Sequence, residues 1–390
     1  MNSSISIPQP LISTNWIINQ KTDLIWFIGG ALGGYLLMFM YEGLGWDMVT
    51  IWFFWVALID TPHFFGTYTR TYLDKQEFRQ RKKLLLWSLL WFIVGPVILF
   101  ICYLMFKTGS ESYSVPWILL TSFFGLWAYW HVVRQHYGFL ALYKKKNQEQ
   151  SKIDYYIDSS LLYAGLMLPF IVFIVRFPDA SELIAPTLAA VEPALGITAE
   201  QLVSGLTLSI VGILALVYIG RQFYLAKNGI PVNIPKALFL IAVIPLHLFI
   251  CFSDAVVEAG IFAFGAFVTI FHDLQYHAIV WFHHKNRYKR NPGTNFGVSA
   301  WLSKSLPRYA LTAVAMGIIF RVLGCTFEVH PGCIPIAITS NVMLFADFGT
   351  DKLLQGALLG LAFHHYFLDQ FIWKTSKDKE LAKDLNIKTT

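Results

Sequence analysis

Ten long apolar segments follow one another along the chain, and they constrain its fold more than any other feature. A helix needs about 20 apolar residues to cross the roughly 30 Å hydrocarbon core of a bilayer. The segments lie near residues 23–42, 47–66, 84–106, 116–140, 154–176, 202–225, 237–253, 259–284, 307–325 and 341–373. Because an open-ended segment satisfies its backbone in lipid only as a helix, the sequence predicts an all-α, polytopic transmembrane helical bundle of about ten spans. Charged residues interrupt the last segment, so a re-entrant piece followed by a helix is the alternative there.

The composition agrees with a protein that lipid solvates. Hydrophobic residues make up 56% of the chain and charged residues 14%, against roughly half and a quarter in soluble domains. We expect a polar N-terminal segment over 1–22, one transmembrane helical domain over 23–375 and a charged cytoplasmic tail over 376–390. The polar opening lacks the pattern of a removable signal peptide, so the first span is expected to act as the targeting signal.

Basic residues gather in alternate loops between the spans. The basic segments are Arg70 to Lys83, Lys144 to Lys152, Arg221 to Lys236, Lys285 to Arg308 and the tail from Lys374. The positive-inside rule therefore predicts a multi-pass protein of the cell membrane with both termini in the cytoplasm. Orientation in the bilayer explains the net charge of +6 better than a nucleic-acid partner does. Cys325 and Cys333 flank an outer loop, where an oxidising compartment would let them form a disulfide. A pair of free thiols is the alternative.

Histidines are concentrated at one level of the predicted bundle. Nine of the eleven close a span that runs toward the cytoplasm: His63, His131, His136, His272, His277, His283, His284, His364 and His365. An isolated histidine is usually a hydrogen-bonded core residue, but ionisable groups in a bilayer are costly and mark functional sites. Imidazole is also the commonest protein ligand of transition metals. We therefore predict a metal site toward the cytoplasmic side of the membrane.

Carboxylates accompany these histidines at helical spacing. Asp60 precedes His63 by three residues, Asp273 precedes His277 by four, and Asp369 follows His365 by four, so each pair can share a helix face. The candidate metal ligands are His63, His131, His136, His272, Asp273, His277, His284, His364, His365 and Asp369. Imidazole and carboxylate ligands without thiolate favour one or two non-haem Fe²⁺ ions. A haem held between two axial histidines from different helices is the alternative.

Two histidine pairs do not fit a single ion on a regular helix. His131 and His136 are five residues apart, as are His272 and His277, so each pair points about 140° apart at roughly 100° per residue. Either a π-bulge in both helices brings the pair to one side, or one histidine of each pair is not a ligand. Asp273, His277 and His284 share an alternative face of their helix.

Four histidine motifs, taken in order, resemble those of the Brp/Blh family of membrane carotenoid-cleaving dioxygenases, over about fifty residues. The strings are TPHFFGT with His63, RQHYGFL with His136, FHDLQYHAIVW with His272 and HHYFLDQFIW with His364 and Asp369. The resemblance implies iron ligands at His63, His136, His272 and a second histidine of the third motif. The family pair in that motif is four apart, whereas here position 276 is Tyr276 and the next histidine is His277.

These features together predict an O₂-dependent oxidoreductase. The leading hypothesis is a non-haem iron oxygenase with O₂ as co-substrate, acting on an apolar substrate dissolved in the bilayer, such as a carotenoid, isoprenoid or lipid chain. Oxidative C=C cleavage is one such reaction. A di-iron desaturase or hydroxylase, which needs an electron donor, is the alternative, and a haem electron carrier or an ion or metal transporter are rivals from other classes. Tyr276, Arg134 and Asp60 are the candidate catalytic residues beside the metal.

Overall fold

The computed structural model describes residues 11–106, 115–178, 193, 196–326, 343–345 and 348–387. Within this part of the chain the fold is all-helical apart from four short strands, which confirms the predicted class. The expected partner of Cys325, Cys333, lies outside the described residues, and Cys325 is itself disulfide-bonded.

Seven helical segments in the described part of the chain are long and apolar enough to cross a membrane. They are Gln20–Gly43, Met48–Arg70, Lys82–Met105, Lys152–Arg176, Ala199–Lys227, Ile234–Phe252 and Leu306–Cys325. The chain is therefore a membrane protein. The other three predicted spans correspond to α8 (Val115–Lys146), α14 (Ile261–Arg290) and α17 (Thr350–Ile372). These helices are long enough to span but more polar, because they carry most of the histidines and basic ends, so ten spans stays a prediction.

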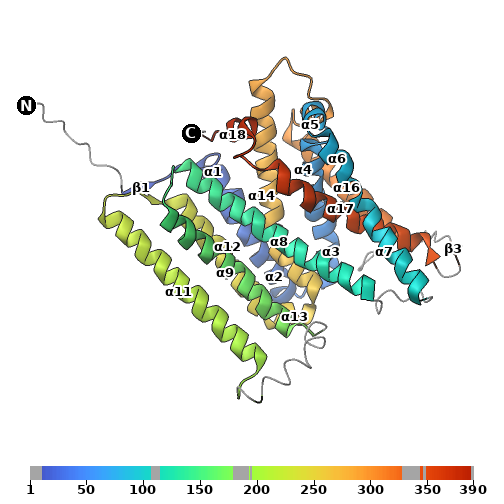
Figure 1. The fold of residues 1–390 in the computed structure, drawn as a ribbon, viewed down its shortest axis with the longest axis horizontal. Coiled ribbons are helices and arrows are strands. Elements are labelled where there is room, and N and C mark those ends of the chain that lie inside the picture. Colours follow the sequence, from blue (N-terminus) through green and yellow to red (C-terminus); the bar gives the residue numbers. More distant parts are fainter. Residues whose placement is uncertain are drawn as a thin grey trace, which may run out of the picture. The chain divides into compact units, whose positions relative to one another are not determined.

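The helices form two compact units, each built from two stretches of chain. The first unit comprises Met1–Met38 and Val133–Phe271, and the second comprises Phe39–Val132 and His272–Thr390. Of the three boundaries, the first lies between α2 (Leu32–Met38) and η3 (Phe39–Gly43), and the other two fall inside α8 and α14, which therefore contribute residues to each unit. Figure 1 follows the chain by colour from the N-terminus to the C-terminus.

In the first unit, α9 contacts both α11 and α12 (Figure 1). Its remaining elements are short and mostly near the N-terminus. In chain order the unit contains β1 (Ile12–Ser13), α1 (Gln20–Thr22), η1 (Asp23–Ile28), η2 (Gly29–Ala31), α2 (Leu32–Met38), α9 (Lys152–Arg176), α11 (Ala199–Lys227), β2 (Val232–Asn233), α12 (Ile234–Phe252) and α13 (Asp254–Ala259). The strands β1 and β2 pair in parallel.

The second unit holds most of the histidines. Its α17 contacts α7 and α4, and α16 contacts α4 and η4. In chain order it contains η3 (Phe39–Gly43), α3 (Met48–Trp55), η4 (Val56–Asp60), α4 (Thr61–Arg70), α5 (Lys75–Gln80), α6 (Lys82–Ser88), α7 (Trp91–Phe106), α15 (Val298–Leu302), α16 (Leu306–Thr326), β3 (Met343–Phe345), β4 (Phe348–Gly349), α17 (Thr350–Ile372) and α18 (Lys379–Asp384). The strands β3 and β4 pair antiparallel directly before α17.

Glycines bring α17 into backbone contact with α7. A Cβ atom at Gly356 would lie 2.4 Å from the backbone nitrogen of Pro96, and one at Gly360 would lie 2.6 Å from Cα of Phe92. Small residues four apart allow such close approach between membrane helices. The sequence GALLG therefore fixes the depth at which α17, and the histidines that follow on it, pack against α7.

The charged tail folds back onto its own unit. Helix α18 buries Leu381 and Asp384, and Asp384 pairs with Arg290 at the end of α14. Arg287 lies 3.6 Å from the same carboxylate, and Arg81 on the loop between α5 and α6 lies 2.7 Å from Asp378. The described part of this charged segment, up to residue 387, is therefore packed against the rest of the second unit.

Candidate metal centre

A π-helical turn leads into the helix that carries the first histidine. The turn η4 ends at Asp60, and α4 follows directly from Thr61 with Pro62 in its first turn. π-Helical turns are rare and occur preferentially at functional sites. This junction places Asp60 and His63 side by side, with Asp60 Oδ1 3.8 Å from His63 Nδ1.

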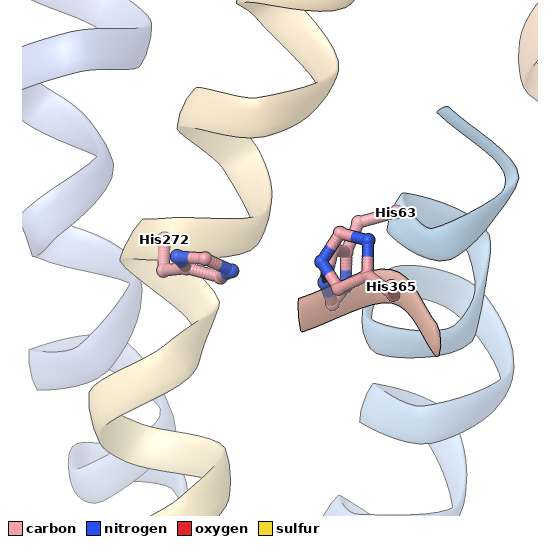
Figure 2. A group of neighbouring side chains, drawn as sticks. All are labelled: His63, His272 and His365. Atoms are coloured by element: carbon pink, nitrogen blue, oxygen red, sulfur yellow. Dashed lines mark hydrogen bonds between the residues drawn. The ribbon is translucent and has the colours of Figure 1, made fainter. Parts of the chain in front are cut away.

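Four imidazoles from four helices of the second unit form a closed group, which we call the four-histidine cluster. They belong to His63 on α4, His131 on α8, His272 on α14 and His365 on α17. Successive ring centroids lie 4.7 Å apart for His63 and His365, 4.8 Å for His365 and His131, 4.9 Å for His131 and His272, and 5.2 Å for His272 and His63. Figure 2 shows three of the rings reaching toward one another from separate helices.

These separations lie in the range expected between neighbouring ligands of one metal ion. The ligand atoms of His63, His272 and His365 are close enough to share an ion, whereas His131 can share one with His365 and Asp369. Metal–nitrogen bonds of about 2.0–2.1 Å would put neighbouring ring centroids roughly 4.6–5.3 Å apart when each ring turns one nitrogen inward at tetrahedral or square angles. His63 Nε2 and His365 Nε2 are 3.1 Å apart, as two ligands of a shared ion would be. The four side chains are at most 6% exposed, so water does not solvate this concentration of ring nitrogens.

Three carboxylates surround the four-histidine cluster. Asp273 Oδ1 lies 3.0 Å from His63 Nδ1, and Asp369 Oδ2 lies 3.7 Å from His365 Nε2 and 3.9 Å from His131 Nε2. Among the described residues, three sets are close enough to hold an ion. They are His63, His272 and His365; His131, His365 and Asp369; and Asp60, His63 and Asp273.

Oxygen atoms also face the outer nitrogens of two cluster rings. Asp273 faces Nδ1 of His63, and the Thr67 hydroxyl lies 2.7 Å from Nδ1 of His365. Trp55 Nε1 in turn donates a 3.2 Å hydrogen bond to Asp273. Metal-binding histidines commonly direct their second ring nitrogen to a carboxylate or another oxygen in this way, which orients the ring. The donor set thus fits a metal ion, with Nε2 of both rings directed inward.

Neither histidine pair with five-residue spacing lies on a π-bulge, so only one histidine of each pair faces the cluster. Both α8 and α14 are α-helical through their histidines, so the members of each pair diverge. The structure brings His131 and His272 into the cluster, and it gives His136 and His277 other neighbours. The resemblance implied His136 and His277, whereas His131 and His365 stand with His63 and His272 here.

Three further candidate ligands in the second unit have other partners. His277 Nδ1 lies 3.4 Å from the Tyr309 hydroxyl, His284 Nδ1 lies 3.1 Å from Ser303 Oγ, and His364 Nε2 lies 2.8 Å from the Tyr72 hydroxyl. None of the three histidines is in the sets that can share an ion among the described residues. Helix rotation explains this, since His364 is adjacent to His365 and points to another side of α17.

His136 and Arg134 belong to the first unit. The His136 ring is buried, with its centroid 5.6 Å from that of His247 and 5.1 Å from that of Phe271. Arg134 donates to the Tyr163 hydroxyl and lies over the ring of Tyr137. The structure therefore gives both residues other neighbours in the first unit. Their roles as metal ligand and catalytic residue stay predictions from the sequence.

Tyr276 lies where the sequence suggested, beside the cluster, and two other residues there were missed. The Tyr276 hydroxyl is 2.6 Å from Thr67 Oγ1 and donates to Asp369 Oδ1 at 2.9 Å. Thr67 follows His63 by one helical turn, and this spacing was the available signal. Trp55 carries no such signal, because it reaches Asp273 only through the tertiary fold.

The fold and the four-histidine cluster define a membrane protein with a candidate metal centre. Searches with family models, curated proteins and solved structures find no match to this chain.

Proposed function

We propose that this chain is a membrane non-haem iron oxygenase that acts on an apolar substrate dissolved in the bilayer. The observation that carries the proposal is the closed four-histidine cluster, with centroid separations of 4.7–5.2 Å between successive rings. Iron held there would supply the oxidising chemistry with O₂ as co-substrate. Four neutral imidazoles with nearby carboxylates suit Fe²⁺ better than a soft metal ion.

The protein's own residues would hold the site rigid and dry. Asp273 and Thr67 face the outer nitrogens of His63 and His365. On the other side, Tyr366 stacks on His131 with centroids 4.7 Å apart, and Trp127 stacks on Phe363 at 5.5 Å. Aromatic surroundings of this kind favour a carotenoid, isoprenoid or lipid chain over a polar substrate. Asp60 and Tyr276 are the catalytic candidates beside the cluster.

The arrangement favours the oxygenase over the rivals from other classes. An ion pathway distributes ionisable groups through the membrane, whereas these histidines gather at one point. A haem between two axial histidines needs room for the porphyrin, and His63 Nε2 and His365 Nε2 are only 3.1 Å apart. We place the protein in the cell membrane, with ten spans and the site toward the cytoplasm.

A two-ion centre is the second candidate, and one observation favours it. Asp60, His63 and Asp273 form a second set close enough to hold an ion, and it shares His63 with the set that contains His272 and His365. A desaturase or hydroxylase with two irons would need an electron donor, whereas oxidative C=C cleavage would not. Iron stoichiometry and the need for a reductant separate the two reactions.

The test is elemental analysis of the purified full chain together with turnover of membrane-extracted apolar compounds. We expect at least one iron per chain, and loss of both iron and activity in His63→Ala and His131→Ala. His364→Ala is the matched control, because this buried histidine adjoins the cluster and pairs with Tyr72 instead. A chain without iron, or His63→Ala protein with full activity, would refute the proposed function.

A further inference from the structure

A buried hydroxyl holds the ring that closes the four-histidine cluster. Thr67 is fully buried, and its Oγ1 lies 2.7 Å from His365 Nδ1, 2.6 Å from the Tyr276 hydroxyl and 3.1 Å from Asp369 Oδ1. A hydroxyl has one proton to donate and two lone pairs with which to accept. The direction of each of these three contacts therefore determines which nitrogen of His365 carries the proton.

Asp369 decides the direction. A carboxyl oxygen that carries no proton only accepts hydrogen bonds, and Asp369 Oδ1 accepts from both Thr67 and Tyr276. Thr67 has then used its one proton, so its oxygen is left to accept from His365 Nδ1–H. With the proton on Nδ1, the lone pair of His365 is on Nε2, which faces His63 Nε2 at 3.1 Å.

We propose that Thr67 is a positioning residue of the metal centre, which fixes His365 in the Nδ1-protonated tautomer and so presents Nε2 to the ion. The inference rests on the proposed function, because it assigns a role at the same centre. It deepens that function by naming a residue that holds a ligand without contacting the metal. Asp369 acts through Thr67, since its Oδ1 accepts the Thr67 proton, and Tyr276 donates to the same oxygen.

The opposite arrangement makes a different prediction. If Thr67 instead donates to Nδ1, the proton of His365 is on Nε2 and points toward His63 Nε2 as an ordinary hydrogen bond. The two histidines would then satisfy each other by this hydrogen bond, and the pair would need no metal ion. The tautomer of His365 therefore discriminates between a ring poised for an ion and a pair that needs none.

The experiment compares three variants of the full chain in lipid. Thr67→Val keeps the shape and removes the hydroxyl, and Thr67→Ser restores the hydroxyl. Thr69→Val is the matched control, because Thr69 is equally buried on the same helix and its hydroxyl donates only to the Gly66 carbonyl, at 2.8 Å. Co²⁺ affinity is measured by optical titration, and the tautomer by ¹⁵N NMR of histidine-labelled, metal-free protein, with His365 assigned by its loss in His365→Gln.

We expect Thr67→Val to bind Co²⁺ about 10- to 100-fold more weakly, as is typical when a residue that orients a metal ligand is lost. Thr67→Ser and Thr69→Val should keep wild-type affinity. Metal-free wild type should show His365 protonated on Nδ1, and Thr67→Val should lose that preference. Wild-type affinity and tautomer in folded Thr67→Val protein would overturn the inference while the proposed function stands.

The two proposals can fail separately. Wild-type protein that binds neither Fe²⁺ nor Co²⁺ would overturn the proposed function. The NMR measurement on metal-free protein would still decide whether Thr67 sets the tautomer of His365. A wild-type ring protonated on Nε2 would overturn the positioning role, whatever the metal content.

Discussion

At the scale of single residues, the contact between Tyr276 and Thr67 sets which histidine of α14 faces the four-histidine cluster. His272 and His277 were equal candidates, because five residues along a helix separate side chains by about 140° at roughly 100° per residue. Which of the two faces the centre depends on how α14 is rotated against α4 and α17. That rotation is set by contacts such as Tyr276 with Thr67, which no local spacing encodes.

Gly66 offers a test at this scale. A Cβ atom there would lie 2.8 Å from Cε1 of Tyr276, so Gly66→Ala must push the buried ring of Tyr276 away from α4. We expect a loss of about 1–3 kcal/mol in the free energy of unfolding, as for other overpacked core sites, together with weaker Co²⁺ binding. Thermal melts and optical titration measure these two effects.

Gly125→Ala is the control for Gly66→Ala. A Cβ atom at Gly125 meets nothing within 4 Å, and the residue lies inside α8. Alanine in a helix interior is favoured over glycine by roughly 0.5–1 kcal/mol. A Gly66→Ala protein as stable and as metal-competent as Gly125→Ala would show that Tyr276 is not held against α4.

At the scale of elements, the contact between α7 and α17 should govern the metal centre from a distance. In Gly356→Ala the new Cβ would lie 2.4 Å from the backbone nitrogen of Pro96, and backbone cannot yield as a side chain can. We expect α17 to shift and to carry His365 out of the cluster, with loss of bound iron. Gly212→Ala on α11, where a Cβ meets nothing within 4 Å, should keep its iron. Full iron in Gly356→Ala would contradict this coupling.

The packed tail is a second element with a measurable role. Asp384 is fully buried and pairs with Arg290 and Arg287, so Asp384→Ala leaves two cations without this partner. Arg290 is partly exposed and keeps Glu380, and Arg287 keeps Asp74 and Glu77. We therefore expect a lower melting temperature, with a loss smaller than the roughly 3–5 kcal/mol of a buried charge left without a partner. Lys383→Ala is the control, because its side chain is 56% exposed. Equal melting temperatures for the two variants would mean that α18 adds no stability.

At the scale of the whole molecule, hydrophobic length predicted the helices well and their grouping not at all. Each predicted span coincides with a helix, although the last helix begins at Thr350 rather than near residue 341. The two compact units join chain stretches far apart in sequence, and two of their three boundaries fall within α8 and α14. Apolar segments carry no record of which neighbour they pack against, because lipid and protein interiors are similarly apolar.

Topology gives the prediction that belongs to this scale. The basic loops predict that Asn228 and Lys383 lie in the cytoplasm and Leu44 outside, and all three residues are exposed. Single cysteines there should react with a membrane-impermeant maleimide accordingly: Leu44→Cys in intact cells, the other two only after the inner face is opened. Buried Cys102 and Cys251 should stay unmodified, and the unmutated chain measures any background.

Each outcome of the labelling has a distinct structural meaning. Four predicted spans separate Asn228 from Lys383, so ten spans require both to react from the same face. If Lys383→Cys reacts in intact cells while Asn228→Cys does not, an odd number of spans separates the two residues and the count of ten is wrong. Reversal of all three would invert the bundle and put the four-histidine cluster at the outer leaflet. Because α17 carries His365, its path decides whether that ring reaches the other three from a full span or from a re-entrant helix.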